Sequence, residues 1–408
     1  MPGPTSLEGG GCLVLIAGII AEYDPFHAGH AWHIAETRRC TGCDYVAVAM
    51  AGSFTQRGEA ACLSKAARVR MALRGGADAV FELPALFVVR SADAFARGGV
   101  GVLAGLGVDV LSFGAECGDI ALLRRVASLR DGEDAAFERL LREGLERGES
   151  HPRAWGEAAA RVLGLGGDLL AQPNNALAVE YMRALYALRA RTEPLAIPRR
   201  GRYHGALDGE GFASASAIRA ALFTDRRPEA LAAVPACVRE IAAAAAPMHA
   251  PDDLLLWTLR NMSDAEIAAL ADVPEGLEHR IKALAAEVPS REALIDRVKS
   301  KRYTRARIAR ITTHALLGLT RALADRHAWP AYARLLGVRR DAMPLLTELK
   351  RRASLPIASD PVGLKGDEVF QLECRATDLR ALMCEGGEAR RAGQELTTKF
   401  IVEEGYGS

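Results

Sequence analysis

The sequence predicts an α/β protein: a Rossmann-like domain with a parallel sheet, then a largely helical region and a small mixed C-terminal unit. Three observations support this. Short apolar runs alternate with helical segments in the first part of the chain, the middle is almost wholly helical in pattern, and the last stretch changes character. At 408 residues the chain is also too long for one ordinary domain.

The predicted strands are short apolar runs, which are typical of strands buried on both faces. They cover residues 13–20, 45–50, 79–83 and 108–113, with 195–197 as a further candidate. Helical segments at about 30–39, 65–73 and 91–106 separate the first four, and another is expected at 214–223. This alternation indicates a parallel sheet covered by helices, in which ligands bind beyond the carboxyl ends of the strands.

We expect four segments along the chain. Residues 1–12 are rich in Gly and Pro and are expected to form a disordered tail. The sheet domain is expected at 13–225, the helical region at 226–340 and the small α/β unit at 341–408. The first apolar run is too short to span a membrane and lacks the basic start of a signal peptide.

The composition is that of an ordinary globular protein, with 50% apolar and 25% charged residues. A net charge of +1 argues against a wholly basic nucleic-acid coat but allows a local basic patch. Eight scattered cysteines do not resemble a disulfide framework, so a cytoplasmic location is expected. Cys40 and Cys43 form a single C-x-x-C without the second pair that a zinc site would need.

Histidines gather where the first predicted strand gives way to a helix. His27, His30 and His33 fall within seven residues there. A helix N-terminus offers unpaired N–H groups and a positive dipole end, which suit phosphate, and Gly29 permits close approach. Two imidazoles three residues apart can donate hydrogen bonds to oxygens that gain charge during attack on phosphorus. We therefore predict His27 and His30 as catalytic; a metal site with Asp24 is the alternative.

Further segments extend this pattern along the chain, in order, over about residues 13–400. They are 22–30 (EYDPFHAGH), 53–59 (SFTQRGE), 113–116 (FGAE), 173–175 (PNN), 212–219 (FASASAIR), 301–308 (KRYTRARI) and 376–379 (ATDL). Together they resemble the tRNA(Met) cytidine acetate ligase family, within the H-x-G-H nucleotidylyltransferases. The sequence departs from the family at Asp24, where Asn is usual, and at Ala51, where Ser is common. A carboxylate beside triphosphate needs an intervening cation, so Asp24 is expected to alter the role of Mg²⁺.

The resemblance implies a ligase that uses ATP to convert acetate to acetyl-AMP. The enzyme would then acetylate the wobble cytidine of elongator tRNA(Met) to N(4)-acetylcytidine. It implies ATP and acetate as substrates, Mg²⁺ as a cofactor and tRNA as the partner, without a membrane or a protein partner. The residues that it assigns to ATP binding are Ile20, Ala21, Glu22, Tyr23, Asp24, Pro25, Phe26, Ala28, Gly29, His33, Gly114, Asn174, Asn175, Arg199, Arg200, Ser214, Ser216 and Arg219.

Several of these residues have structural alternatives. Asn174 and Asn175 follow a proline, where capping of a helix is an equal alternative. Ser214 is expected to cap its helix in addition to binding phosphate. Lys65 and Arg68 fit a solvated helix face better than a phosphate site. Gly114 could simply end a strand, and Arg199 with Arg200 could form a solvated pair.

A cationic run at 299–310 holds six Lys or Arg and no acidic residue. Within it we predict Lys301, Arg302, Tyr303 and Arg305 as tRNA-binding, with cations on one helical stripe and Tyr303 as a stacking surface. A solvated helix is the alternative. The run argues against a small-molecule adenylyltransferase of the same superfamily, and the intact H-x-G-H segment argues against a non-catalytic tRNA-binding protein.

Overall fold

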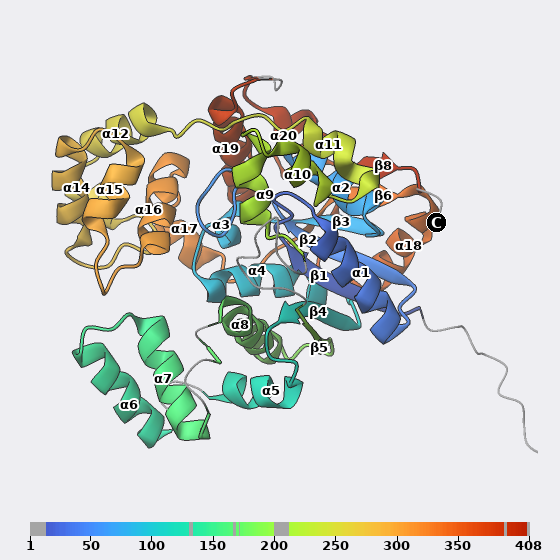
Figure 1. Cartoon of the computed structure of the whole chain (residues 1–408), viewed down its shortest axis with the longest axis horizontal. Coiled ribbons are helices and arrows are strands. Elements are labelled where there is room, and N and C mark those ends of the chain that lie inside the picture. Colours follow the sequence, from blue (N-terminus) through green and yellow to red (C-terminus); the bar gives the residue numbers. More distant parts are fainter. Residues whose placement is uncertain are drawn as a thin grey trace, which may run out of the picture.

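Strands from both ends of the chain form one sheet at the centre of the molecule (Figure 1). The computed structural model describes residues 14–129, 134–165, 169–170, 172–199, 212–386 and 390–405, so the tail expected at 1–12 lies outside the described residues. Five strands are parallel, in the spatial order β5 (Glu193–Pro198), β4 (Val110–Ala115), β1 (Ile16–Ala21), β2 (Tyr45–Ala51) and β3 (Ala79–Leu83). The predicted α/β class with a parallel sheet is confirmed.

The C-terminal part of the chain extends this sheet. Strand β6 (Ala333–Arg339) runs antiparallel to β3, and β7 (Ile357–Ala358) and β8 (Ile401–Glu403) pair in parallel with β6. The first of these strands falls within the range expected to be helical, and the other two fall within the range expected to be a separate unit. The difference arises because β6 pairs with a strand about 250 residues earlier, and no local pattern reveals such a partner.

Helices cover both faces of the sheet and build the rest of the molecule. Up to residue 243 they are α1 (Ala28–Thr41), α2 (Lys65–Arg74), α3 (Ala85–Val88), α4 (Ala92–Gly105), α5 (Ile120–Ser128), α6 (Ala135–Glu146), α7 (His151–Leu163), α8 (Pro173–Leu188), α9 (Ala215–Leu222), α10 (Arg227–Ala232) and α11 (Arg239–Ala243). After residue 250 they are α12 (Asp252–Asn261), α13 (Asp264–Ala268), α14 (Leu277–Glu287), α15 (Arg291–Val298), α16 (Arg305–Leu317), α17 (Arg321–Arg326), α18 (Met343–Arg352), α19 (Glu368–Met383) and α20 (Gln394–Thr397). Short 3-10 turns occupy Ala236–Val238, Arg340–Ala342 and Pro361–Leu364.

The apolar strands divide their side chains between two cores. In β2, Ala47 and Ala49 join the core around α4 and α8, whereas Val46 and Val48 join the core with α1 and α2. This follows from the twofold alternation of side chains along a strand that is buried on both faces. The sheet is thereby fixed from both sides, and the ends of its strands are held in place.

Helices α12 to α16 form a third core at one side of the sheet (Figure 1). Leu255, Ile281, Leu294 and Ile308, from four of these helices, are each at most 2% exposed. Helix α16 also packs against α19, which connects this helical region to the sheet domain.

A buried cluster of charges joins α2 to the C-terminal helices. The Lys65 Nζ atom lies 2.5 Å from Glu82 Oε1 and 2.7 Å from both Glu373 Oε1 and Glu395 Oε1. Arg334 Nη1 lies 3.1 Å from Glu82 Oε2. All five side chains are at most 8% exposed, so the solvated position expected for Lys65 is wrong. The carboxylate partners of Lys65 come from β3, α19 and α20, which is why the local sequence did not reveal them.

Removal of Lys65 should therefore be costly. We predict that Lys65→Ala lowers the free energy of unfolding by roughly 3–5 kcal/mol, because three carboxylates stay buried without their shared cation. Arg326→Ala, which removes an exposed ion pair with Glu368, is the matched control and should cost about 1 kcal/mol or less. Urea unfolding of both variants measures the difference, and equal losses would contradict the prediction.

Candidate active site

A cavity of about 480 Å³ lies beyond the carboxyl ends of β1, β4 and β5. From β1 the chain proceeds to β2 on one side, whereas from β4 it proceeds to β5 on the other. The cavity therefore occupies a topological switch point, where open α/β sheets bind their ligands. The predicted residues that line it are Ile20, Ala21, Glu22, Tyr23, Asp24, His27, Gly29, His30, His33, Gly114, Asn174, Arg199, Ser214, Ser216 and Arg219.

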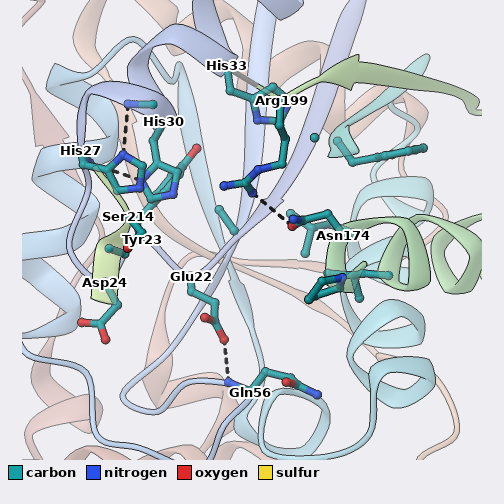
Figure 2. A pocket seen from close by; sticks show the side chains of 18 of the residues that line it. Glu22, Tyr23, Asp24, His27, His30, His33, Gln56, Asn174, Arg199 and Ser214 are labelled. Carbon is teal, nitrogen blue, oxygen red and sulfur yellow. Dashed lines mark hydrogen bonds between the residues drawn. The ribbon is translucent and has the colours of Figure 1, made fainter. Parts of the chain in front are cut away.

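The start of α1 holds two imidazoles in a fixed orientation (Figure 2). His27 Nδ1 accepts a hydrogen bond from the Gly29 N–H at 3.0 Å, and His30 Nδ1 accepts one from the His27 N–H at 3.3 Å. The rings stack with centroids 3.8 Å apart. Since a nitrogen that accepts carries no proton, each neutral ring has its hydrogen on Nε2. The Nε2–H groups are thus left available as donors to a ligand.

Gly29 makes this arrangement possible. A Cβ atom at this position would lie 2.8 Å from His27 Cε1, so any side chain would displace the imidazole. The glycine of the H-x-G-H segment therefore makes room for the neighbouring histidine, and its close approach to a ligand stays a prediction.

Both imidazoles are neutral at physiological pH. Burial, and secondarily the charge of Arg199, lowers the pKa of His27 to about 4. Burial also holds the pKa of His30 well below its usual value, with further lowering by His27, His33 and Arg199. Desolvation disfavours the imidazolium form, and an anion placed beside the rings would favour it. The pair is suited to a ligand that brings negative charge.

His33 is fixed by a chain of hydroxyl groups. Thr37 Oγ1 donates to the His33 carbonyl at 2.8 Å, and Ser112 Oγ lies 2.7 Å from Thr37 Oγ1 and 3.1 Å from His33 Nε2. Because the Thr37 hydrogen is already used, Ser112 donates to Thr37 and accepts from His33 Nε2–H. Burial, followed by the charge of Arg199, lowers the pKa of His33 to about 4. His33 therefore presents Nδ1 as an acceptor.

Asp24 is paired within the protein. Its Oδ1 accepts from the Cys62 N–H at 2.8 Å, and its Oδ2 lies 3.4 Å from Arg219 Nη1. Arg219 also donates to the Asp24 carbonyl. The carboxylate is thus balanced by Arg219, and a further role for Mg²⁺ beside it stays a prediction. The alternative metal site with His30 and His33 is not formed, since the described residues contain no group of three potential metal ligands.

Some predicted ATP-binding residues do not line the cavity. Phe26 is fully buried, and Pro25 is buried beside it in the turn. Ala28 N–H donates to the Ala233 carbonyl at 3.2 Å. Asn175 is 1% exposed, accepts from the Cys117 N–H at 2.8 Å and donates to the Leu169 carbonyl at 2.9 Å. These four residues lie behind those that line the cavity, and their contact with ATP stays a prediction.

The opposite wall comes from β4, α8 and the end of β5. Arg199 Nη1 donates to Asn174 Oδ1 at 3.1 Å (Figure 2), and Asn174 Nδ2 donates to Glu116 Oε1 at 2.5 Å. A Cβ at Gly114 would lie 3.3 Å from Arg199 Cγ, so the glycine lets this side chain cross the strand. Helix α8 is capped by Gln172, so the alternative role of Asn174 as the cap is wrong. Arg200 lies outside the described residues.

The third wall is the start of α9. Ser214 caps this helix, as expected, by accepting from the Ala217 N–H at 3.2 Å, and its hydroxyl lies 3.1 Å from that of Ser216. Hydroxyl groups and a helix N-terminus beside Arg219 are suited to phosphate oxygens.

Several lining residues were not predicted. They are contributed by α1, the 55–57 segment, α8 and the residues before α9, and include Trp32, Thr55, Gln56, Arg57, Tyr181 and Phe212. Glu22 Oε1 accepts from the Gln56 N–H at 2.6 Å (Figure 2). Burial raises the pKa of Glu22 above its usual value. Residues 53–59 were part of the family resemblance, and that was the available signal for Gln56.

Arg68 is buried behind this site and binds the backbone at the ends of β1 and β2. It is 1% exposed and donates from Nη1 to the Glu22 carbonyl at 2.8 Å and to the Ala51 carbonyl at 2.9 Å. The expectation of a solvated helix face is therefore wrong for Arg68 as well. Its guanidinium satisfies carbonyl groups at the ends of β1 and β2, where the strands stop pairing.

The cationic run has a different local structure from the one expected. Helix α16 begins at Arg305, with Thr304 as its N-cap, so Lys301, Arg302 and Tyr303 lie in the preceding loop and share no helical stripe with Arg305. Arg305 pairs with Asp296 at 2.8 Å and with Glu292. Lys301 and Arg302 are exposed, and Tyr303 is half-buried.

The family model of HIGH nucleotidyl transferases matches residues 15–395. The tRNA(Met) cytidine acetate ligase of Acetivibrio thermocellus is 34% identical over 95% of this chain and 99% of its own length. The ligase of Caldicellulosiruptor saccharolyticus is 36% identical over 90% and 93%. The chain belongs to the tRNA(Met) cytidine acetate ligase family.

Solved structures agree with this membership. Thermotoga maritima TmcAL in its apo form superposes with a TM-score of 0.88 at 29% identity, covering 96% of this chain and 100% of that one. The same enzyme bound with alpha-thio ATP gives a TM-score of 0.87 at 28% identity, with the same coverage. No helix in the described part of this ligase-family chain is long and apolar enough to cross a membrane.

The lowered histidine pKa values predict an acid-sensitive fold. Between about pH 6.5 and 4 the unfolded His27 binds a proton and the folded one does not, so stability should fall as pH falls through this window. His27→Asn keeps an acceptor at the N-cap and removes the titrating ring, so it should lose less stability between pH 7 and 4.5 than the wild type. Urea unfolding at the two pH values measures this.

His151→Asn changes an exposed histidine at the start of α7 and serves as the control. It should show the same pH dependence as the wild type. If His27→Asn loses as much stability as the wild type between pH 7 and 4.5, the His27 imidazole must be charged in the folded wild-type protein.

Proposed function

We propose that this chain is an ATP-dependent tRNA(Met) cytidine acetate ligase, which forms acetyl-AMP and transfers the acetyl group to the wobble cytidine of elongator tRNA(Met). The observation that carries this proposal is the pair of neutral imidazoles, tethered through Nδ1 at a helix N-terminus inside the switch-point cavity. The names of the related ligases supply the acyl group and the RNA.

In the first step an acetate oxygen attacks the α-phosphorus of ATP in line. A bond forms between that oxygen and phosphorus, the bond to the bridging oxygen breaks, and pyrophosphate leaves. His27 and His30 donate from Nε2 to phosphate oxygens as their negative charge increases. We assign Arg199, Ser214, Ser216 and Arg219 to the same phosphate groups, since they line the cavity around the imidazoles.

Mg²⁺ is expected to accompany ATP. Such sites usually bind Mg²⁺ through one or two carboxylates together with phosphate oxygens, rather than through a complete protein cage. Glu22 fits this role, because its Oε1 accepts from the Gln56 N–H, its Oε2 has no hydrogen bond to another described residue, and the side chain lines the cavity. When bound, the ion would offset charge on the triphosphate.

In the second step the exocyclic amine of cytidine attacks the acetyl carbonyl. The new carbon–nitrogen bond replaces the bond between the carbonyl carbon and the phosphate oxygen, AMP leaves with the electron pair, and the amine loses a proton. No covalent enzyme intermediate is required. We assign the RNA to the helical region at 226–340, with Lys301 and Arg302 as exposed phosphate contacts and Tyr303 and Arg305 beside them.

The imidazole pair can be tested directly. His30→Ala and His27→Asn should each slow acetate-dependent ATP–pyrophosphate exchange by about 100-fold or more, the effect of removing one donor to developing charge. Because His27→Asn keeps the helix cap, its loss should come without a large change in melting temperature. Exchange near the wild-type rate in His30→Ala would place the reaction centre elsewhere.

The two half-reactions should also be separable. We predict that the protein forms bound acetyl-AMP from ATP and acetate without RNA, because the phosphate-binding groups all line one cavity. Elongator tRNA(Met) should then consume it and yield N(4)-acetylcytidine, as measured by mass spectrometry of nucleosides. A transcript with uridine at the wobble position should leave acetyl-AMP intact, since the attacking amine is missing. Acetyl groups on a protein side chain before transfer would refute this mechanism.

A further inference from the structure

A second cavity, of about 320 Å³, lies where the helical region meets the sheet domain. Three arginines line it: Arg90 between α3 and α4, Arg307 on α16 and Arg321 on α17. Among the described residues that line this arginine cleft, Asp272 is the one carboxylate. Three permanent cations around one anion leave a surplus of positive charge, which favours an anionic ligand.

The arginines are oriented by the protein without being neutralised. Arg307 donates from Nε and Nη2 to the Asp272 carbonyl at 3.0 and 2.8 Å, and Arg321 donates to the Val273 carbonyl. These acceptors carry no formal charge. Arg90 Nε lies 3.9 Å from Asp272 Oδ1 and, although buried, has no hydrogen-bond partner within the described residues.

A fourth guanidinium reinforces this imbalance. Arg310 follows Arg307 by one turn of α16, is 9% exposed, and has a buried Nε without a hydrogen-bond partner in the described part of the chain. Arg310 does not itself line the cleft; buried donors are normally satisfied, so the Arg90 Nε in the cleft, unpartnered among the described residues, indicates that a ligand completes its hydrogen bonding.

The arginine cleft adjoins the switch-point cavity to which we assign ATP, which we call the ATP cavity. The Arg90 carbonyl accepts from Gln56 Nε2 at 3.1 Å, and the Gln56 N–H donates to Glu22, whose side chain lines the ATP cavity. Ala92 also lines that cavity. Since it is two residues from Arg90, the two Cα atoms are at most about 7 Å apart. The cleft and the ATP cavity are therefore neighbours across the segment around Arg90.

We propose that the arginine cleft binds a backbone phosphodiester of the tRNA, adjacent to the cytidine that is acetylated. This inference rests on the proposed function. Guanidinium groups match the paired oxygens of a phosphodiester, and contacts to phosphates fix the register of a nucleic acid on a protein. The cleft would thus position the target base, while Lys301 and Arg302 hold RNA farther along the helical region.

Charge changes at Arg90 and Asp272 test this proposal in opposite directions. Arg90→Ala should reduce the slope of log Kd for tRNA against log salt by about one, and Arg90→Lys should retain most of it. Asp272→Asn should tighten tRNA binding, because it removes the carboxylate that competes for the arginines. Asp272 has φ +60°, a conformation that Asn also tolerates, so this variant keeps the backbone.

Filter binding across a salt series measures the affinities, with acetyl-AMP formation without RNA and melting temperature as parallel readouts. Both should be unchanged in Asp272→Asn and Arg90→Lys. Arg124→Ala, which removes an exposed cation on α5 paired with Glu193, is the matched control and should leave the salt slope unaltered.

The outcomes separate the two proposals. Wild-type protein that neither binds nor acetylates tRNA would refute the proposed function itself. If the wild-type protein acetylates tRNA, an unchanged salt slope in Arg90→Ala or weaker tRNA binding in Asp272→Asn would refute only the proposal that the cleft binds a tRNA phosphodiester. A changed rate of ATP–pyrophosphate exchange in Arg90→Ala with unchanged tRNA affinity would assign the cleft to free pyrophosphate, and would equally overturn it.

Discussion

The arrangement of this molecule depends on the buried charge cluster around Lys65. Charges in an interior are stable only when their partners are all present, because each one has lost its hydration. Glu373 shows how tightly the cluster is built: its Oε2 accepts the Ala85 N–H at 2.8 Å, and a Cβ at Gly52 would lie 2.1 Å from its Oε1. Since Glu373 is 308 residues from Lys65, the sheet domain is completed only when the end of the chain has folded onto it.

Helix α2, which begins at Lys65, also connects this charge cluster to the residues around the ATP cavity. One turn after Lys65, Arg68 donates to the carbonyls of Glu22 and Ala51, at the ends of the two central strands. The Glu22 carboxylate then accepts from Gln56, and Gln56 Nε2 donates to the Arg90 carbonyl beside the arginine cleft. Helix α2 therefore links the C-terminal helices, the ATP cavity and the cleft through hydrogen bonds, although none of its residues lines either cavity.

The sequence was informative where the physical cause is local. Apolar runs predicted the parallel strands, and the histidine segment predicted the start of a helix, because both depend on neighbouring residues. Prediction failed where the partner is distant. Lys65 and Arg68 resemble solvated residues until strands and helices from elsewhere surround them. The run at 299–310 contains no acidic residue, but its Arg305 forms ion pairs with Glu292 and Asp296 of α15. Asn174 and Asn175 are adjacent and alike in sequence, and only the first turn of α8 shows that Asn174 lines the cavity whereas Asn175 is buried away from it.

Guanidinium and imidazole donors occupy positions that match their chemistry. A guanidinium is charged at every physiological pH, so deep burial requires either a carboxylate, as for Arg334, or several carbonyls, as for Arg68. An imidazole avoids that requirement, because it enters the interior neutral and still offers an N–H. The His27 and His30 rings can therefore stack in the cavity wall, where two guanidinium groups would repel each other. Negative charge that develops on phosphate then meets donors whose pKa it raises, so the interaction strengthens as the reaction proceeds.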